Sequence, residues 1–323
     1  MPRILIIRFS SIGDIVLTSP VIRCLKLQLG AEIHFVTKKS FGSIFSANPY
    51  IDKIHTIEKK VSEVLPELKK LQFDYIIDLH NNLRSRQIRL ALSAKAYSFE
   101  KLNFEKWLLV NLQINHLPDI HIVDRYMKSV EKLEVKNDGK GLDYFIPEGT
   151  KMPIEISTLA TPFIAFAIGA AHATKRMPRE KIISICQKIE RPIVLLGGPS
   201  DAEAGAAIAQ AVGGHLINLC GKISLHQSAL VVQKSELLIT HDTGMMHIAA
   251  GLKKRIISVW GNTVPEFGMT PYYPDNEDIS AIIEVKNLSC RPCSKIGYGA
   301  CPKGHFRCME LIEEEEILRH LTD

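Results

Sequence analysis

The stretch ILIIRFSSIGDIVLTSPVIRCLK, residues 4–26, contains the turn that decides the fold. Four apolar residues predict a buried strand, two serines and a glycine predict a turn, and an apolar helical pattern follows. A strand that runs through such a turn into a helix is typical of α/β proteins. One carboxylate, Asp14, lies in the turn. From the residues alone, Asp14 is either the N-cap of a helix that begins near residue 15 or a reactive group.

The composition is that of an ordinary globular protein, with 46% hydrophobic and 23% charged residues among 323. This length suits two domains. The first residues, MPRILIIRFSS, carry charges on both sides of only four apolar residues. We therefore expect no secretion signal and a cytoplasmic protein, whose seven cysteines are thiols or metal ligands rather than disulfides. The net charge of +5 suits anionic substrates or an anionic membrane face, and a slightly basic solvated surface explains it equally well. Because no basic run is interleaved with aromatic residues, no nucleic-acid partner is predicted.

Short β-branched runs alternate with helical patterns along the chain, which predicts parallel sheets covered by helices. A polar, glycine-bearing stretch at residues 134–153 reads as a linker, and the alternation then restarts. We therefore predict two Rossmann-like domains, residues 1–150 and 151–323, that face each other across a cleft, with ligands at the carboxyl ends of the strands. In the first half the predicted strands are residues 4–8, 32–36, 53–57, 75–79 and 95–98, and the predicted helices are 20–29, 61–70, 86–92 and 123–133.

The second half offers a phosphate-binding turn in ELLITHDTGMMHIAAGL, residues 236–252. Asp242 and Thr243 are good N-cap types, Gly244 lets a ligand approach the backbone, and His247 falls on the same face of the helix. Free N–H groups at a helix start attract a phosphate or diphosphate. A plain capped helix with a packed histidine explains this stretch equally well.

Two more loops follow predicted strands in the second half. The loop in GAAHATKRMPREK, residues 169–181, brings Lys175 and Arg176, which would neutralise a diphosphate or simply be solvated. In LLGGPSDAEAG, residues 195–205, Glu203 would accept hydrogen bonds from ribose hydroxyls or favour the start of its helix. The glycine spacing is not GxGxxG, so no standard NAD site is predicted.

Several motifs of this chain, taken together, resemble those of the heptosyltransferases of glycosyltransferase family 9. These motifs are the stretch around SSIGD and the sequences TKRMP, GGPSDAE, GKISL, HDTGMMHIAAGL and VWGNTVP. The resemblance extends over nearly the whole chain in order and spacing. It implies a GT-B fold, with the acceptor on the first domain and the donor on the second. Met177 departs from the family, which commonly has tryptophan there. The implied roles are a catalytic Asp14, a diphosphate-gripping Lys175, a ribose-contacting Glu203, a phosphate loop with Asp242, Thr243, Gly244 and His247, and donor contacts from Ser10, Ser11 and Gly13.

The resemblance implies an inverting transfer of heptose from ADP-heptose to the inner core of lipopolysaccharide. Asp14 would act as the general base, and Lys175 with the helix start near Thr243 would stabilise the leaving diphosphate. No DxD motif occurs, so we expect metal-independent transfer without a cofactor. Three alternatives stay open: a family member with another nucleotide sugar or surface-glycan acceptor, a GT-B nucleotide-sugar epimerase, and a non-catalytic nucleotide-sugar binder.

Two stretches of the first half concern the lipid-linked acceptor. Arg84 and Arg86, in residues 74–89, would suit an acidic or phosphorylated core saccharide, although surface arginines are an equal explanation. The sequence NFEKWLLVNLQI, residues 103–114, suits either peripheral contact with the cytoplasmic face of the inner membrane or a core helix.

The last stretch, residues 290–321, contains a cysteine cluster and an acidic helix. Four soft ligands at this spacing would close a zinc site, but reduced thiols that pack an irregular loop are the favoured interpretation. The final helix is expected either to close the second domain or to cross back to the first. The four cysteines are Cys290, Cys293, Cys301 and Cys308.

Overall fold

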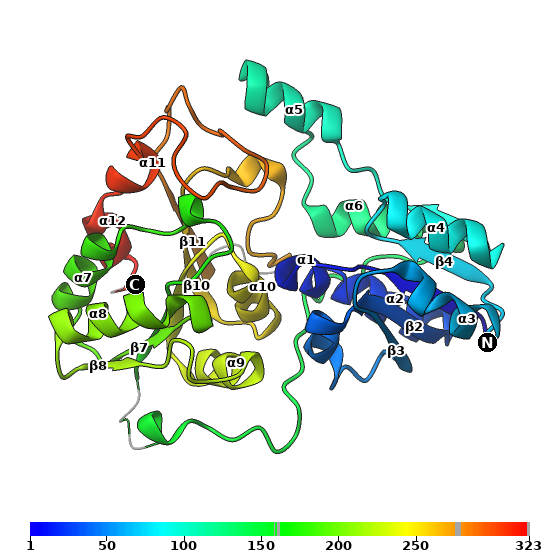
Figure 1. Cartoon of the computed structure of the whole chain (residues 1–323), viewed down its shortest axis with the longest axis horizontal. Helices are drawn as coiled ribbons and strands as arrows, with labels where there is room; N and C mark the ends of the chain where they lie inside the picture. Colours follow the sequence, from blue (N-terminus) through cyan, green and yellow to red (C-terminus); the bar gives the residue numbers. More distant parts are fainter. Residues whose placement is uncertain (158, 160–161, 275–278, 322–323) are drawn as a thin grey trace. The chain divides into compact units, whose positions relative to one another are not determined.

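The computed structural model describes residues 1–157, 159, 162–274 and 279–321. The chain forms two compact units: residues 1–101 with 120–148, and residues 102–119 with 149–323. Figure 1 shows the two units, with the ribbon coloured along the sequence from blue to red. This division differs from the predicted one in the segment 102–119, which belongs to the second unit. There Leu109 packs against Val264 and Phe267.

The first unit is built on a parallel five-stranded sheet in the order β3-β2-β1-β4-β5. Its central strand is the apolar run at the start of the chain, whose residues 4–7 are completely buried. A sheet covered on both faces favours such continuous apolar strands. The predicted strands are confirmed to within two residues at their ends: β1 (Arg3–Ile7), β2 (Glu32–Lys38), β3 (Lys53–Ile57), β4 (Tyr75–Asp78) and β5 (Lys95–Ser98).

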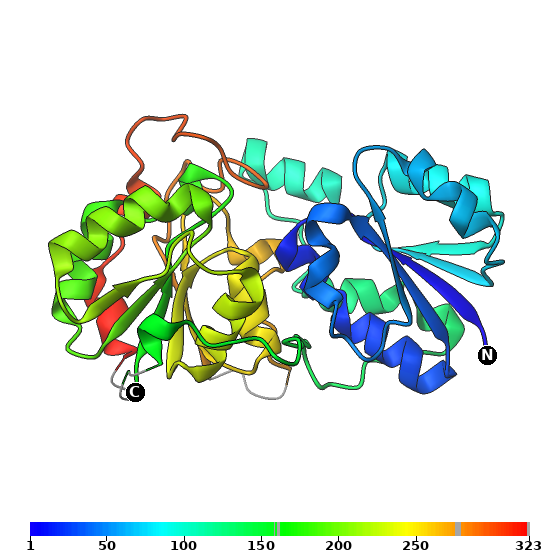
Figure 2. The ribbon, with the colours of Figure 1, turned by 60° about the horizontal axis from the view of Figure 1, so that its bottom comes forward.

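Helices cover both faces of the first sheet, with α2 and α6 on one face and α3 and α4 on the other (Figure 2). The predicted helix 61–70 is interrupted: a 3₁₀ turn at Val61–Glu63 precedes the short α3. A separate short helix, α1, precedes α2 and was not predicted. The helices are α1 (Ile12–Val16), α2 (Ser19–Leu29), α3 (Leu65–Lys69), α4 (Leu83–Leu92) and α6 (Ile122–Lys128).

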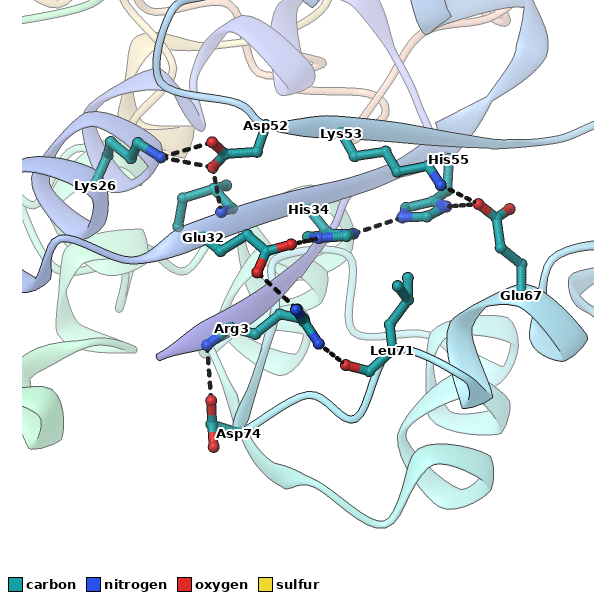
Figure 3. A network of polar contacts seen from close by, with 11 residues as sticks. Arg3, Lys26, Glu32, His34, Asp52, Lys53, His55, Glu67, Leu71 and Asp74 are labelled. Atoms are coloured by element: carbon teal, nitrogen blue, oxygen red, sulfur yellow. Dashed lines mark hydrogen bonds and ion pairs between the residues drawn. The ribbon is translucent and has the colours of Figure 1, made fainter. Parts of the chain in front are cut away.

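A polar network ties together the amino-terminal ends of β2 and β3, as Figure 3 shows. His34 and His55 are both 2% exposed, and Nδ1 of His34 lies 2.8 Å from Nε2 of His55. Nε2 of His34 lies 2.8 Å from Glu32, and Nδ1 of His55 lies 3.2 Å from Glu67. The contact with His34 lowers the pKa of the Glu32 carboxyl. Parallel strands bring their carboxyl ends to the opposite edge of the sheet, so this network supports the fold and lies away from the ligand edge.

The second unit contains a parallel six-stranded sheet in the order β11-β10-β9-β6-β7-β8. The continuous apolar runs again form its buried centre, since β6, β7 and β9 are buried along their whole lengths. The strands are β6 (Ile164–Ala167), β7 (Ile193–Leu196), β8 (Leu216–Asn218), β9 (Leu237–His241), β10 (Arg255–Trp260) and β11 (Ser280–Glu284).

In the second unit α7 and α8 pack together on one face of the sheet, and α9 packs with α10 (Figure 1). The final helix α12 packs on α7, where Glu314 accepts hydrogen bonds from Ser184 and Lys188. The helices are α5 (Asn103–Leu112), α7 (Arg179–Lys188), α8 (Ala202–Val212), α9 (Leu225–Lys234), α10 (Gly244–Gly251), α11 (Arg307–Glu310) and α12 (Glu314–Arg319). Among the described residues, no helix has the length and apolar character needed to cross a membrane.

Each sheet has one point where the strand order reverses direction. In the first unit this point lies between β1 and β4, and in the second it lies between β6 and β9. Ligands of open α/β sheets bind beside the carboxyl ends of the strands at such points. The loops that matter are therefore those that follow β1, β4, β6 and β9.

Candidate active site

The turn after β1 holds Asp14 with three short contacts. Ser11 donates to Asp14 Oδ2 from its backbone nitrogen at 3.0 Å and from its hydroxyl at 2.7 Å. Nη2 of Arg8 lies 2.5 Å from Asp14 Oδ1. The alternative of Asp14 as an N-cap is wrong in position, because α1 begins at Ile12 and Ser11 is its N-cap. Asp14 serves the helix instead as the acidic residue at the third position, which reaches back to the cap.

Arg8 is a fixed cation beside this carboxylate. It is 8% exposed, its Nε donates to the carbonyl of Ser10 at 3.0 Å, and its Nη1 donates to the carbonyl of Leu79. Burial opposes the charge of Arg8, but the interactions with Asp14, Tyr126 and Asp78 together outweigh burial, so the pKa of Arg8 is raised. The Asp14 side chain remains 24% exposed, which leaves it accessible to a substrate hydroxyl.

His80 enters the same cluster from the turn after β4. Its ring meets Phe9 edge to face, with centroids 4.9 Å apart. Burial, together with the charges of Arg8 and Lys101, lowers the pKa of His80 to about 3. At neutral pH His80 is therefore an uncharged hydrogen-bonding group beside the Asp14 turn.

Further cations surround this turn. The guanidinium carbon of Arg84 lies 5.6 Å from the centre of the Phe9 ring. Burial and the charge of Arg8 lower the pKa of Lys101. Arg86 is exposed on α4, and residues two apart on a helix do not share a face, so Arg86 is not part of this cluster. The cluster of Arg8, Arg84 and Lys101 gives the turn a positive field that suits an anionic ligand.

In the second unit Lys175 and Asp242 meet where the strand order reverses. Lys175 ends the 3₁₀ turn Ala173–Lys175 after β6, and Asp242 follows β9. Nζ of Lys175 lies 2.5 Å from Asp242 Oδ2, and the hydroxyl of Thr263 donates to the same oxygen at 2.7 Å. Both side chains of the ion pair are mostly buried, with 16% and 11% exposed. Lys175 and Asp242 thus lie together in the second unit, and their roles toward a diphosphate stay predictions.

A buried histidine holds the loop that carries Lys175. The backbone nitrogen of Met177 donates to Nε2 of His241 at 3.0 Å, and His241 is fully buried at the end of β9. Burial, with the charge of Arg176, lowers the pKa of His241 to about 4. His241 is therefore neutral at physiological pH, as an acceptor of this hydrogen bond must be.

The helix α10 begins where the phosphate loop was predicted. Thr243 is its N-cap residue, Gly244 is its first residue, and His247 is buried within it. The first backbone N–H groups of α10 have no partners within the helix and carry a partial positive charge. Together with the Lys175 ammonium they form an environment suited to a diphosphate.

Glu203 and its neighbour Asp201 differ in exposure. Glu203 is exposed in the first turn of α8, whereas Asp201 is 6% exposed and accepts a hydrogen bond from Gly198 N at 2.8 Å. Asp201 also pairs with Arg176 at 3.5 Å. A Cβ added to Gly169 would lie 2.2 Å from Asp201 Oδ2, so the loop after β6 needs glycine there. Asp201 thus holds the loop, and Glu203 is left open to a ligand.

The cysteine cluster contains free thiols. Cys308 is buried, and burial raises its pKa to about 11. Sγ of Cys290 lies 3.8 Å from Nε2 of His305. In the part of the chain that the structure describes, no three His, Cys, Asp or Glu side chains come together in a way that would hold a metal ion.

The site residues fall into two sets that belong to different units. The first unit contains Ser10, Ser11, Gly13, Asp14 and Arg84. The second unit contains Lys175, Glu203, Asp242, Thr243, Gly244 and His247. The donor contacts assigned to Ser10, Ser11 and Gly13 stay predictions. Sequence reasoning missed the roles of Arg8, Lys101 and His241. Arg8 carried a signal, since it directly follows the apolar strand β1, but Lys101 is brought in by folding from a distant position.

Two parallel α/β units with polar sites at the switch points of their sheets define a protein of the GT-B class. The solved structure of the glycosyl transferase family 9 from Veillonella parvula has the same fold, with a TM-score of 0.77 and 23% identity over 98% of this chain and 95% of its own. The E. coli heptosyltransferase WaaC with ADP gives a TM-score of 0.70 and 18% identity, with 99% of each chain covered. The predicted fold class is confirmed.

The family is equally clear. The model of glycosyltransferase family 9 (heptosyltransferase) matches residues 62–298. Lipopolysaccharide heptosyltransferase 1 of Campylobacter coli is 23% identical over 98% of this chain and 97% of its own. Lipooligosaccharide heptosyltransferase 2 of Haemophilus influenzae is 26% identical over 99% of this chain and 98% of its own. The chain belongs to glycosyltransferase family 9 (heptosyltransferase) and is an enzyme of glycosyl transfer.

Proposed function

We propose that this enzyme transfers heptose from ADP-heptose to a lipopolysaccharide inner-core acceptor by a single inverting displacement that needs no metal. The observation that carries the proposal is that Asp14 and Lys175 each lie at the switch point of their own sheet. The curated relatives support the choice of substrates, because their names describe heptosyltransferases of lipopolysaccharide and lipooligosaccharide. A solved neighbour that contains ADP supports the choice of nucleotide.

Asp14 is the proposed general base. A sugar hydroxyl is a weak nucleophile, and a carboxylate beside it takes its proton as the hydroxyl oxygen attacks the anomeric carbon. The bond from that carbon to the diphosphate oxygen breaks as the new bond forms, and ADP leaves with the electron pair. Attack opposite the leaving group inverts the anomeric configuration. Arg8 and Ser11 fix the carboxylate so that one defined orientation is presented.

Lys175 and the start of α10 are the proposed support for the leaving group. Negative charge grows on the diphosphate as the bond breaks, and preorganised positive groups stabilise it. The ammonium of Lys175 has three donors, so it can keep Asp242 and still bind a phosphate oxygen. Asp242 thereby holds the lysine in place rather than contacting the phosphates itself.

Metal independence rests on this charge. The absence of a DxD motif and the presence of Lys175 and α10 make a bound cation unnecessary for the leaving group. A more distant structural neighbour, the glycosyltransferase TibC from enterotoxigenic E. coli, is described as iron-containing (TM-score 0.61, 12% identity). Chelation therefore belongs in the first assay.

Arg84 and Lys101 are the proposed acceptor-side cations, and an acidic or phosphorylated core saccharide is the matching ligand. Arg86 remains a proposed acceptor contact from its exposed place on α4. Charge-assisted contacts of this kind orient an anionic sugar while its hydroxyl approaches Asp14.

The test is the release of ADP from ADP-heptose in EDTA, with and without core lipopolysaccharide that lacks heptose. We expect release only with the acceptor, together with a product that has gained one heptose of inverted configuration. Release of a free epimerised sugar without acceptor would replace the proposal with a nucleotide-sugar epimerase. ADP binding without any turnover would favour a non-catalytic binder, and turnover of another nucleotide sugar would change the donor.

Peripheral contact with the cytoplasmic face of the inner membrane is proposed through α5. Leu109 is buried on one side of this helix, but Phe104 and Trp107 are 67% and 47% exposed, and their rings stack 6.5 Å apart. Exposed aromatic side chains on a helix favour a membrane interface. Co-sedimentation with anionic lipid vesicles should fall when both are changed to serine, and unchanged binding would contradict the contact.

A further inference from the structure

Asn262 is a buried amide without a hydrogen-bond partner in the described part of the chain. It follows β10 and is 1% exposed, and neither its Oδ1 nor its Nδ2 is paired. Buried polar side chains nearly always have a partner, either in the protein or in a bound molecule. Two buried amide atoms without hydrogen bonds are destabilising, so we looked for a ligand that would satisfy them.

The neighbours of Asn262 touch the two loops of the donor site. On one side, a Cβ added to Gly261 would lie 2.8 Å from the carbonyl of Thr174, the residue before Lys175. On the other side, the Thr263 hydroxyl donates to Asp242. The register of the sheet agrees, because Val259 pairs with His241 and β10 therefore ends beside the loop of Asp242.

The backbone around Asn262 is held independently of its side chain. Arg291 donates to the carbonyl of Gly261 at 2.6 Å and to that of Thr263 at 2.9 Å. Its guanidinium also pairs with Glu284 at 2.7 Å. The segment is thus fixed by Arg291, and the Asn262 amide is not needed to shape it.

The chemistry of an amide selects the kind of ligand. A phosphate accepts hydrogen bonds but does not donate them, so it would leave Oδ1 unpaired. Sugar hydroxyls both donate and accept, and two neighbouring hydroxyls match the Oδ1 and Nδ2 pair. We propose that Asn262 binds hydroxyls of the transferred sugar and helps to determine which nucleotide sugar is used. This inference rests on the proposed function, since it takes Lys175 and α10 as the diphosphate site.

The test compares the binding of ADP and ADP-heptose to the full chain by calorimetry. Asn262→Leu keeps the size of the side chain and removes both hydrogen bonds. We expect ADP affinity within about twofold of wild type and ADP-heptose affinity reduced about ten- to a hundredfold, as two lost hydrogen bonds imply. The melting temperature should stay level or rise, because an unpaired buried amide is removed. Asn262→Ser, which keeps one hydrogen-bonding group, should recover part of the affinity.

Asn48 provides a matched control in the first unit. It is 6% exposed, and its Nδ2 is also buried and unpaired, while its Oδ1 accepts from Tyr50 N. Asn48→Leu should lower the melting temperature by removing that bond, with ADP-heptose affinity unchanged.

Each outcome separates the two proposals. Equal loss of ADP and ADP-heptose affinity in Asn262→Leu would overturn the sugar assignment, and so would unchanged affinity for both. Wild-type protein that binds neither compound would instead overturn the proposed donor. The same experiment would then use another nucleoside diphosphate sugar that does bind, together with its free nucleoside diphosphate. Asn262→Leu should again lose affinity for the nucleotide sugar and keep its affinity for the free nucleotide.

Discussion

The two units use a carboxylate paired with a cation at the same topological position, but in opposite ways. In the first unit, Asp14 is 24% exposed and the buried Arg8 fixes it. In the second, Asp242 is 11% exposed and fixes Lys175 through its carboxylate and its carbonyl, which leaves one donor of the ammonium for a ligand. The first unit thus exposes its anion, Asp14, and buries its cation, Arg8. In the second unit the anion, Asp242, holds the cation, Lys175, in place.

This difference matches the charges that transfer chemistry requires. A base must be a carboxylate that a hydroxyl can reach, and a leaving diphosphate must meet positive charge. The switch point of an α/β sheet brings two loops together but does not determine which charge is exposed. That choice depends on individual side chains, and substitutions can reverse it.

The largest effect is expected from Asp14→Asn. The amide keeps the size of the carboxylate but cannot take the proton, so kcat should fall about 10²- to 10⁴-fold. Asp14→Glu, which keeps the charge at a different distance, should retain more activity than Asp14→Asn. Steady-state rates of ADP release at saturating donor measure both. Near-normal turnover in Asp14→Asn would remove the base from the first unit.

A smaller effect is expected from Lys175→Met, with kcat reduced about 10²- to 10³-fold and donor affinity weakened. The substitution leaves the Asp242 carboxylate without its cation, although Thr263 still donates to it, and the uncompensated negative charge at the diphosphate site repels the ligand. If Asp242 serves mainly to hold the lysine, the double variant with Asp242→Asn should bind ADP better than Lys175→Met alone. A double variant that binds worse would show that Asp242 contributes directly to the nucleotide site.

Acid should weaken the support of the Lys175 loop. The pKa of His241 is about 4 in the fold, below the usual value of about 6.5, because the side chain is buried. Between these values the unfolded chain binds a proton that the folded chain does not, so stability falls as pH decreases from 6.5 to 4. The contribution is at most about 3 kcal/mol. Urea unfolding at several pH values measures the free energy of unfolding. Between pH 6.5 and 4 this free energy should fall less steeply in His241→Gln than in wild type, and an identical pH dependence would contradict this role of His241.

Much of the fold was predictable from the sequence because buried parallel strands are continuous apolar runs. The strand at residues 4–7 and the strands before Lys175 and Asp242 were recognisable for this reason. The interruption before α3 and the separate helix α1 were less so, because short turns depend on a few local hydrogen bonds.

The site was predictable only in its separate loops. Asp14, Lys175 and Asp242 each carry a local signal, since each follows an apolar strand. Arg8 and Lys101 acquire their meaning from packing, and so does His241, whose role depends on its bond to Met177. No spacing in the sequence records such contacts between residues far apart in the chain. The unpaired amide of Asn262 is visible only once its surroundings are known.

The most direct test measures ADP-heptose affinity and kcat side by side for Asp14→Asn and Asp242→Asn. We expect Asp14→Asn to bind ADP-heptose normally and to lose turnover, whereas Asp242→Asn should bind ADP-heptose more weakly because Lys175 is no longer held. Equal loss of affinity in both variants, or turnover that survives in Asp14→Asn, would contradict the opposite use of the two carboxylates.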